Sequence, residues 1–504
     1  SQVQAQARIQ SQTQTQTQTQ INRLRLNDTK PIPKRTQVTH PLAISAPRAG
    51  QRGSFMLTAD VMDAERAETS YRSLISRAWP IILANAAVPT LGLVDTAIIG
   101  NVATTIDLGA IALGAVIFSF VYWSFGFLRM STTGFVAAAA GAQREAELRA
   151  IVARALFMAF GLGILLIILQ SGIAWVAIEL FSASDAVERV TRGYFDLRIW
   201  GAPATLSLFA LMGVLIGLGL SKQLLLIQVF MNGLNIALDL LFAGVFDMGA
   251  PGVALGTALA EWATLALGLV IVVRALKARS ALPKLIDWPE VLRKEALASM
   301  LSSNVDIMIR TLLLILSFAF FADQSARYGE VILASNHLLL QLVSFAAFFL
   351  DGYAFVVEAL VGKARGAGRL GLFRLAVFRS TVLAAATAGM LALLLLFGGT
   401  ALIALLTDID AVREASVPML GFAAVYVAVS FAAFQLDGIF IGLSATREMR
   451  NASIHSIVVY FAAWLLLAPA FGVAGLWAAM IIYVIARAAA LGRYYPRLNK
   501  LISG

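Results

Sequence analysis

LMGVLIGL, at residues Leu211–Leu218, and LDGIFIGL, at residues Leu436–Leu443, are two similar stretches of sequence separated by 225 positions. Two further pairs of segments have nearly the same separation: GAPGVALGTA (Gly249–Ala258) with FGVAGLWAAM (Phe471–Met480), and GFVAAAAG (Gly134–Gly141) with AFVVEALVG (Ala354–Gly362). A nearly constant separation indicates a chain built from two related halves. The alternative is that apolar, glycine-rich segments resemble one another through composition alone.

The overall composition is that of a membrane protein. Hydrophobic residues make up 59% of the 504 residues, charged residues only 13%, and the mean hydropathy is +0.80. No soluble fold could bury this much apolar surface. Because the chain has no cysteine and only three histidines, we expect no disulfide and no metal centre. We attribute the net charge of +10 to cytoplasmic loops rather than to nucleic-acid binding.

A helix needs about 20 apolar residues to cross a bilayer. The sequence contains twelve such stretches: 76–100, 108–140, 150–181, 190–219, 223–246, 252–276, 299–322, 330–362, 371–406, 412–443, 453–470 and 472–492. With both termini in the cytoplasm, 24 lysines and arginines fall on the cytoplasmic side and 5 on the other, which supports this topology. The sequence therefore predicts an all-α polytopic membrane protein with twelve transmembrane helices in two pseudo-symmetric six-helix lobes. Two lobes that enter the membrane from the same side can flank a central cavity, as alternating access requires.

The predicted organisation has four parts. Residues 1–65, which include a Thr/Gln alternation, form a low-complexity tail that is too polar to bury a core, and we expect it to be disordered. Residues 66–277 form the N-terminal lobe, residues 278–298 a basic cytoplasmic linker, and residues 299–504 the C-terminal lobe.

Polar side chains in three spans of the first half define a candidate cation or proton site. Asp95 lies in the first span, Asn235 and Asp239 lie on one face of the fifth, and Thr257 lies in the sixth. At 1.5 Å per residue these positions have similar depth, about 8–10 Å below the outer boundary. Ionisable residues at such depth are costly and usually functional, and two desolvated carboxylates that meet are suited to share a proton. The alternative is that each acid only stabilises its own helix bundle.

Two prolines interrupt the first span at Pro80 and Pro89. A proline inside a helix removes a backbone hydrogen bond and favours a kink. We therefore expect the first helix to bend at one of them as Asp95 gains or loses a proton.

The second half carries a different set of acids, Asp306, Glu358 and Asp437, near the cytoplasmic ends of three spans. They could form a second cation site or an inner gate, or only anchor their helices at the interface. The spacing of Asp306 and Arg310 predicts an ion pair within one helix. Arg129 and Arg310 are the two basic residues expected inside the membrane, and Arg129 needs an acidic or carbonyl partner that the sequence does not identify.

Five segments, in order along residues 70–495, resemble the multidrug and toxic compound extrusion (MATE) family, in particular its DinF-like branch. They are VDTAIIG (Val94–Gly100), RIWGAPA (Arg198–Ala204), NIALDLLF (Asn235–Phe242), EALVGKARGAG (Glu358–Gly368) and DGIFIGLSATREMRNA (Asp437–Ala452). The resemblance implies a two-lobed, twelve-helix antiporter that expels cationic or amphipathic organic compounds in exchange for H⁺ or Na⁺.

The resemblance also implies roles for individual residues. In that family an N-lobe ion site uses an acid on the first helix, an Asn and an Asp on the fifth and a Thr on the sixth; these positions are Asp95, Asn235, Asp239 and Thr257. The proline that bends the first helix falls on Pro80. Asp437 matches a tenth-helix acid of a C-lobe cation site found in some relatives. The seventh-helix glutamate of those relatives has no match, because that helix offers Asp306 instead.

The predicted function is therefore export of small organic cations or amphipathic drugs by a monomer in the bacterial cytoplasmic membrane, in contact with lipid, coupled to H⁺ and without a cofactor. A GxxxxGK[ST] loop is absent from the sequence, so we expect an ion gradient to supply the energy. The alternatives are Na⁺ coupling and a flippase for lipid-linked oligosaccharides, which would need more intramembrane cations than the two expected. An intramembrane enzyme is disfavoured because the chain has no GxSxG or HExxH motif.

Overall fold

The computed structural model describes residues 62–102, 104–179, 184–280, 284 and 286–503, without the side chains of residues 88–102 and 503. The predicted tail lies outside this part of the chain up to residue 61. Residues 62–68 are helical, and Glu65 is buried. The Arg379 guanidinium donates to the Arg66 carbonyl at 3.0 Å, which ties this short helix to the second half of the chain.

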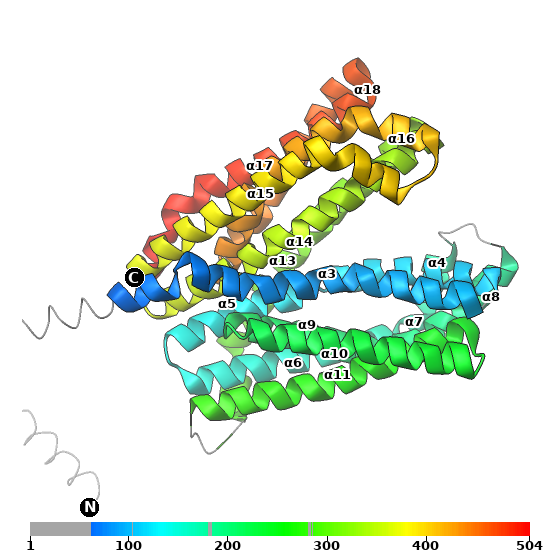
Figure 1. Cartoon of the computed structure of the whole chain (residues 1–504). Helices are drawn as coiled ribbons and strands as arrows, with labels where there is room; N and C mark the ends of the chain where they lie inside the picture. Colours follow the sequence, from blue (N-terminus) through cyan, green and yellow to red (C-terminus); the bar gives the residue numbers. More distant parts are fainter. Residues whose placement is uncertain (1–61, 103, 180–183, 281–283, 285, 504) are drawn as a thin grey trace, which may run out of the picture. The chain divides into compact units, whose positions relative to one another are not determined.

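The described residues are almost entirely helical (Figure 1). The first half contains α3 (Tyr71–Val102), α4 (Thr105–Ser124), α5 (Phe127–Gly141), α6 (Glu145–Ile168), α7 (Gln170–Glu179), α8 (Asp185–Arg198), η1 (Ile199–Gly201), α9 (Ala202–Gly217), α10 (Ser221–Asp239), the π-helix η2 (Leu240–Val245) and α11 (Gly249–Arg279). After the short α12 (Trp288–Val291), the second half contains α13 (Lys294–Arg327), α14 (Glu330–Gly366), α15 (Leu370–Leu406), α16 (Asp410–Ser416), η3 (Val417–Met419), α17 (Leu420–Gly442), α18 (Thr446–Leu498) and α19 (Lys500–Ser503).

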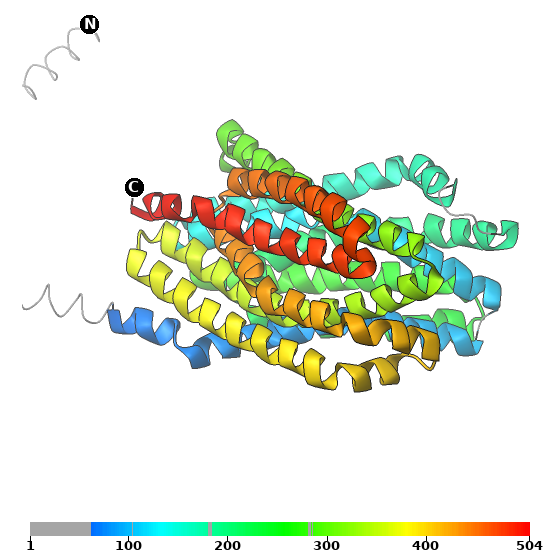
Figure 2. The ribbon, with the colours of Figure 1, turned by 90° about the horizontal axis from the view of Figure 1, so that it is seen from above.

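These helices account for the twelve predicted spans. Ten helical stretches within the described residues are long and apolar enough to cross a membrane. One of them, α18, contains the last two predicted spans, because Gly472 (φ 59°) interrupts the helix between them. The two arms of α18 fold back on each other, with the rings of Tyr460 and Tyr483 5.4 Å apart (Figure 2). The remaining predicted span, the first, corresponds to α3.

The backbone confirms the internal repeat. LMGVLIGL and LDGIFIGL both end in a turn with a left-handed residue, Gly219 (φ 72°) and Ser444 (φ 51°). In both turns a backbone N–H donates to the carbonyl five residues earlier, as in a Schellman helix end: Leu220 to Leu215, and Ala445 to Phe440.

Two more pairs of left-handed residues match between the halves. Gly249 and Gly472, which the sequence paired, have φ of 58° and 59°. Gln143 (φ 56°) and Gly368 (φ 65°) end α5 and α14 and are 225 positions apart. The sequence alignment of Gly134–Gly141 with Ala354–Gly362 is therefore shifted by a few residues. In the structure the turn after Gly141 corresponds to the turn after Gly366, and not to the residues that follow Gly362.

The two halves contact each other through closely packed small residues on α5 and α14. A Cβ atom added at Gly141 would lie 2.2 Å from the Lys363 carbonyl oxygen, and one added at Gly366 would lie 1.9 Å from the Ala138 carbonyl oxygen. Small residues allow helix backbones to approach this closely inside a membrane. In Figure 1 the helices of the second half approach those of the first at the end where the C-terminus is marked. This end is the predicted cytoplasmic side, and we call the α5–α14 contact the seam.

Two buried arginines of α6 hold the predicted linker against the first half. The Arg149 guanidinium donates to the carbonyls of Ser280 at 2.9 Å and Lys284 at 2.7 Å. The Arg154 guanidinium donates to the carbonyl of Val291 at 2.9 Å. Carbonyls beyond a helix end have no intrahelical donor, so these contacts satisfy them and fix the chain after α11.

Candidate functional site

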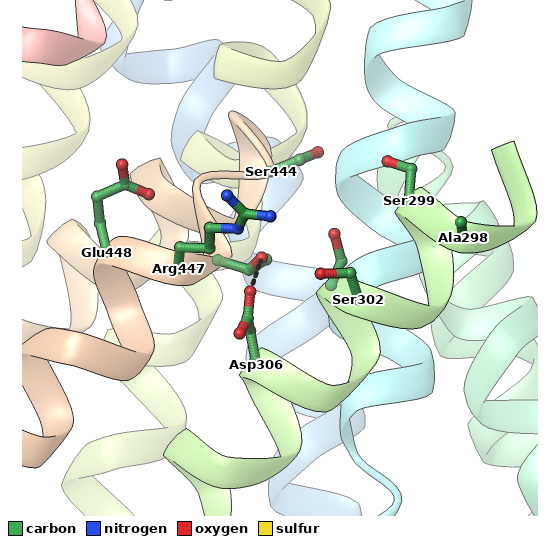
Figure 3. A pocket seen from close by; sticks show the side chains of 9 residues that line it. Ala298, Ser299, Ser302, Asp306, Ser444, Arg447 and Glu448 are labelled. Carbon is green, nitrogen blue, oxygen red and sulfur yellow. Dashed lines mark hydrogen bonds between the residues drawn. The ribbon is translucent and has the colours of Figure 1, made fainter. Parts of the chain in front are cut away.

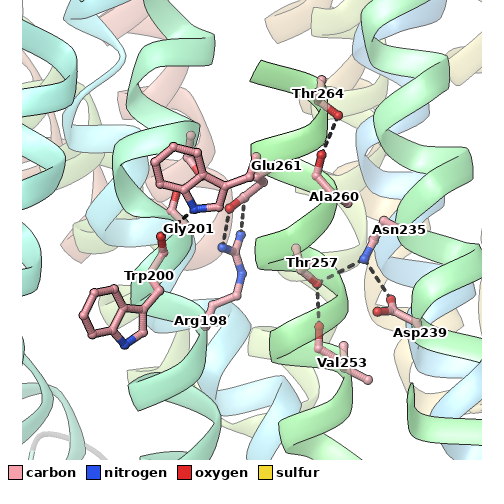
Figure 4. A network of polar contacts seen from close by, with 12 residues as sticks. Arg198, Trp200, Gly201, Asn235, Asp239, Val253, Thr257, Ala260, Glu261 and Thr264 are labelled. Atoms are coloured by element: carbon pink, nitrogen blue, oxygen red, sulfur yellow. Dashed lines mark hydrogen bonds and ion pairs between the residues drawn. The ribbon is translucent and has the colours of Figure 1, made fainter. Parts of the chain in front are cut away.

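A polar cluster in the interior of the first half joins α10 and α11. The Asn235 side-chain amide donates to Asp239 Oδ2 at 3.0 Å and to Thr257 Oγ1 at 3.1 Å (Figure 4). Asn235 and Asp239 are fully buried. The structure thus brings together three of the four residues predicted for the ion site, and Asn235 is the residue that connects the other two.

Local backbone features place Asp239 against α11. Asp239 is the last residue of α10, and the next six residues form the π-helix η2. Single π-helical turns inside helices are frequent at functional sites, because they change the direction in which side chains project. On α11, a Cβ atom added at Gly256 would lie 2.4 Å from Asp239 Oδ1. Gly256 therefore leaves the space that the carboxylate occupies.

The fourth predicted residue, Asp95, has its side chain outside the described part, as has Pro89. The backbone of α3 is helical through Pro80, which is buried, Pro89 and Asp95, so neither proline ends the helix. Bending at either proline stays a prediction. The Asn232 side-chain amide donates to the Ala87 carbonyl at 3.1 Å and fixes α10 to the half of α3 that carries Asp95.

Glu261, one turn after Thr257 on α11, belongs to a separate pair. Its carboxylate accepts two hydrogen bonds, of 2.5 and 2.7 Å, from the guanidinium of Arg198. Arg198 also lies 5.3 Å from the Phe118 ring centroid. Arg198, one of the five basic residues counted on the outer side, is therefore a buried cation held by a bidentate carboxylate (Figure 4).

The predicted ion pair between Asp306 and Arg310 is wrong. Asp306 instead accepts hydrogen bonds from Arg450 at 2.7 Å and from Thr446 at 3.1 Å, both on α18. Arg310 pairs with Asp437 of α17. Both side chains find partners on neighbouring helices, because packing turns them away from their own helix surface.

Asp437 is shared by two buried arginines. Arg310 of α13 and Arg487 of α18 both donate to its Oδ2 atom. Arg487, one of the 24 basic residues counted on the cytoplasmic side, thus lies in the interior of the second half. The expectation of two intramembrane cations is therefore too low, because Arg198 and Arg487 join Arg129 and Arg310. A contact between Asp437 and the distant Arg487 leaves no local signal in the sequence.

Arg129 finds its partner in the other half of the chain. Its Nη1 atom lies 3.4 Å from Glu358 Oε2 on α14, and its guanidinium lies 4.0 Å from the Phe355 ring centroid. Asp306, Glu358 and Asp437 do not converge on one site. Each is buried and has its own arginine partner.

A polar pocket of about 550 Å³ opens beside Asp306 (Figure 3). It lies between the first turns of α13 and the turn that joins α17 to α18. Hydroxyls and charged groups line it: Ser299, Ser302, Ser303, Ser444, Thr446, Asp306, Arg447 and Glu448. The volume is in the range of small-molecule sites.

Comparison with known proteins agrees with this architecture. The sequence model of the MatE family matches residues 80–241 and 307–466, one stretch in each half. DNA damage-inducible protein F of Escherichia coli is 36% identical over 435 residues, which cover 85% of this chain and 93% of that protein. A probable multidrug resistance protein NorM of Pasteurella multocida is 27% identical over 308 residues, which cover 59% of this chain and 64% of that protein.

The fold is also that of a solved transporter. The crystal structure of a mutant of the Vibrio cholerae MATE transporter VcmN superposes with a TM-score of 0.77 at 19% identity and covers 88% of this chain and 100% of that chain. Together with the apolar helices, these similarities identify an integral membrane protein. The chain belongs to the MatE family of multidrug and toxic compound extrusion transporters.

Proposed function

We propose that this protein is a secondary antiporter that exports small organic cations or amphipathic compounds by alternating access. The observation that carries the proposal is the Asn235–Asp239–Thr257 cluster, a fully buried carboxylate held by an amide among membrane helices. A carboxylate at this depth costs free energy, and carboxylates retained inside membrane helices usually mark ion-binding sites. The proposed setting is the bacterial cytoplasmic membrane, with both termini in the cytoplasm and a monomer as the working unit.

We propose H⁺ as the coupling ion. Thr257 already donates its hydroxyl to the Val253 carbonyl at 2.8 Å, and the Asn235 amide nitrogen points into the cluster as a donor. A proton needs one carboxylate, whereas Na⁺ prefers several oxygen ligands. Proton uptake by Asp239 from the outer side would shift the equilibrium between the outward-facing and inward-facing states. The size of this shift is set by the difference in the proton affinity of Asp239 between the two states.

Na⁺ coupling is the second candidate, and one observation favours it. The Asn235 Oδ1 atom is buried and has no hydrogen-bond partner among the described residues. Together with the side-chain oxygens of Asp239 and Thr257, this Oδ1 atom could act as a third oxygen ligand for a cation.

A flippase for a lipid-linked pyrophosphate is less consistent with the charges. Such a cavity would need uncompensated cations. The buried Arg129 and Arg198 each pair with a carboxylate of their own, and Arg310 and Arg487 share the carboxylate of Asp437. Because the NorM relative is named for multidrug resistance, we propose organic cations and amphipathic drugs as substrates, and no enzymatic activity.

The test is export of a fluorescent organic cation from proteoliposomes under separately imposed H⁺ and Na⁺ gradients. We expect export with a H⁺ gradient alone, and loss of export when an ionophore collapses that gradient at constant Na⁺. Export that continues at full rate and stops only on removal of Na⁺ would replace H⁺ by Na⁺ in the proposal. Export under neither gradient would overturn the antiporter itself.

A further inference from the structure

One ion pair in the described residues connects membrane helices of the two halves. Arg129 belongs to α5 of the first half, and Glu358 belongs to α14 of the second. Their side chains are 10% and 0% exposed. The other buried arginine pairs, those of Glu261 and Asp437, each join helices within one half.

The Arg129–Glu358 pair is weakly compensated compared with these other pairs. It has one contact, of 3.4 Å, and Glu358 Oε1 has no hydrogen-bond partner among the described residues. Thr133 donates its hydroxyl to the Arg129 carbonyl instead. Glu261, in contrast, accepts two short hydrogen bonds from Arg198. A buried pair with one long contact recovers little of the free energy lost on removing both charges from water.

The position of the pair links it to the seam. Arg129 lies on α5 before the stretch that packs against α14, and Glu358 lies four residues before Gly362, whose added Cβ would meet Ala137 at 2.5 Å. Another polar contact between the halves joins Ser131, two residues after Arg129 on α5, to Asn304 of α13. Ser303, next to Asn304, lines the pocket of about 550 Å³. The polar pocket is therefore lined by the residue directly before one that contacts the other half.

We infer that Arg129 and Glu358 form a latch that closes the predicted cytoplasmic side and breaks when that side opens. The inference rests on the alternating-access function proposed above. When α5 and α14 separate, both charges gain water, so the open state compensates for the lost ion pair. In the closed state, removal of Arg129 would leave Glu358 buried without its ion-pair partner, and removal of Glu358 would leave Arg129 with only the more distant carboxylate of Asp351. In both cases the population would shift toward the open state.

Distances across the seam test the latch directly. Because the chain has no cysteine, spin labels can be attached at Arg144→Cys and Ala367→Cys, two exposed positions at the ends of α5 and α14. The measurement is the label-to-label distance distribution in lipid nanodiscs, at one pH and without substrate or gradient. We expect Arg129→Gln and Glu358→Gln each to raise the long-distance fraction several-fold.

The paired variants make the test specific. The double variant Arg129→Gln/Glu358→Gln should shift the distribution less than either single variant, because no unpaired charge remains. The charge-reversed variant Arg129→Glu/Glu358→Arg should return it toward the native one. If the single variants fail to fold, the distances in these two charge-balanced variants still test the latch. Arg310→Gln is the matched control, because it removes a buried arginine within one half while Asp437 keeps Arg487. It should leave the distances unchanged.

Unchanged distances in both single variants, or a double variant that shifts as far as the sum of the two, would overturn the latch. Failure of the latch is separable from failure of the proposed function. Export by the native protein together with unchanged distances would reject only the latch. Absence of gradient-driven export by the native protein would reject the antiporter, whatever the distances show.

Discussion

The amide of Asn235 donates to Asp239 one turn later on the same helix and to Thr257 on the neighbouring helix. One side chain thus fixes the distance between α10 and α11 at the level of the buried carboxylate. Any ion that binds Asp239 must compete with or replace this amide, so the three residues are expected to act as one unit in transport.

Asp239→Asn should abolish gradient-driven export while the protein stays folded. Asparagine has nearly the same volume as aspartate but cannot take up a proton, so coupling is lost and packing is kept. The measurement is the initial rate of export from proteoliposomes under a fixed H⁺ gradient. Asp323→Asn, which changes an exposed acid at the end of α13, is the matched control and should transport normally. Undiminished export by Asp239→Asn would remove Asp239 from the coupling site.

Asn235→Ala should slow export without abolishing it. The substitution removes the donor that orients Asp239 but leaves the titrating carboxylate in place. We expect a rate between those of the native protein and Asp239→Asn when the same assay is run over a series of H⁺ gradients. A complete loss equal to that of Asp239→Asn would show that Asn235 itself binds the coupling ion.

Gly366→Ala should destabilise the seam. The added methyl group would lie 1.9 Å from the Ala138 carbonyl oxygen, so α5 and α14 would have to move apart. Overpacking of this kind costs about 1–3 kcal/mol. The measurement is the Tm of the detergent-solubilised protein by size-exclusion chromatography after heating. Gly389→Ala in α15, where no atom lies within 4 Å of the added group, should leave the Tm almost unchanged. Equal effects of both substitutions would contradict close packing at the seam.

Arg198→Met should lower stability more than the double variant Arg198→Met/Glu261→Met. Loss of one partner leaves the other charge buried and unpaired, which costs about 3–5 kcal/mol, whereas replacement of both partners by apolar side chains is often nearly neutral. The Tm values of the two single variants and the double variant check this expectation. A double variant less stable than both single variants would mean that the pair contributes mainly through its packing.

The fold could be predicted from sequence because its determinants are local. Long apolar stretches set the helices, and the distribution of lysine and arginine separated the loops. The repeat was visible because the turns at Gly219 and Ser444 follow similar segments. Asn235 and Asp239 could be grouped because residues four apart share a helix face, and Thr257 was placed near them by depth.

The charge partners could not be predicted in the same way. Arg310 was assigned to Asp306 because the i, i+4 rule considers only one helix, yet packing directs it to Asp437 on another. Arg487 lies inside the last predicted span, 472–492, but close to its cytoplasmic end, so it was counted with the cytoplasmic charges. Which helices become neighbours depends on the packing of the whole bundle, and a single sequence does not record that.

The attachment of the linker to α6 limits how the halves can move. Arg154 holds the chain at Val291, and α13 begins at Lys294, so only a tether of two residues, Leu292 and Arg293, lies between this attachment and the second half. Consecutive Cα atoms are 3.8 Å apart, so the Cα atoms of Val291 and Lys294 can never be more than about 11 Å apart. Such a short tether permits one half to pivot about this point but not to slide along the other. The hinge of the transport cycle is therefore expected at these two residues, and each half should swing about it as a rigid lever.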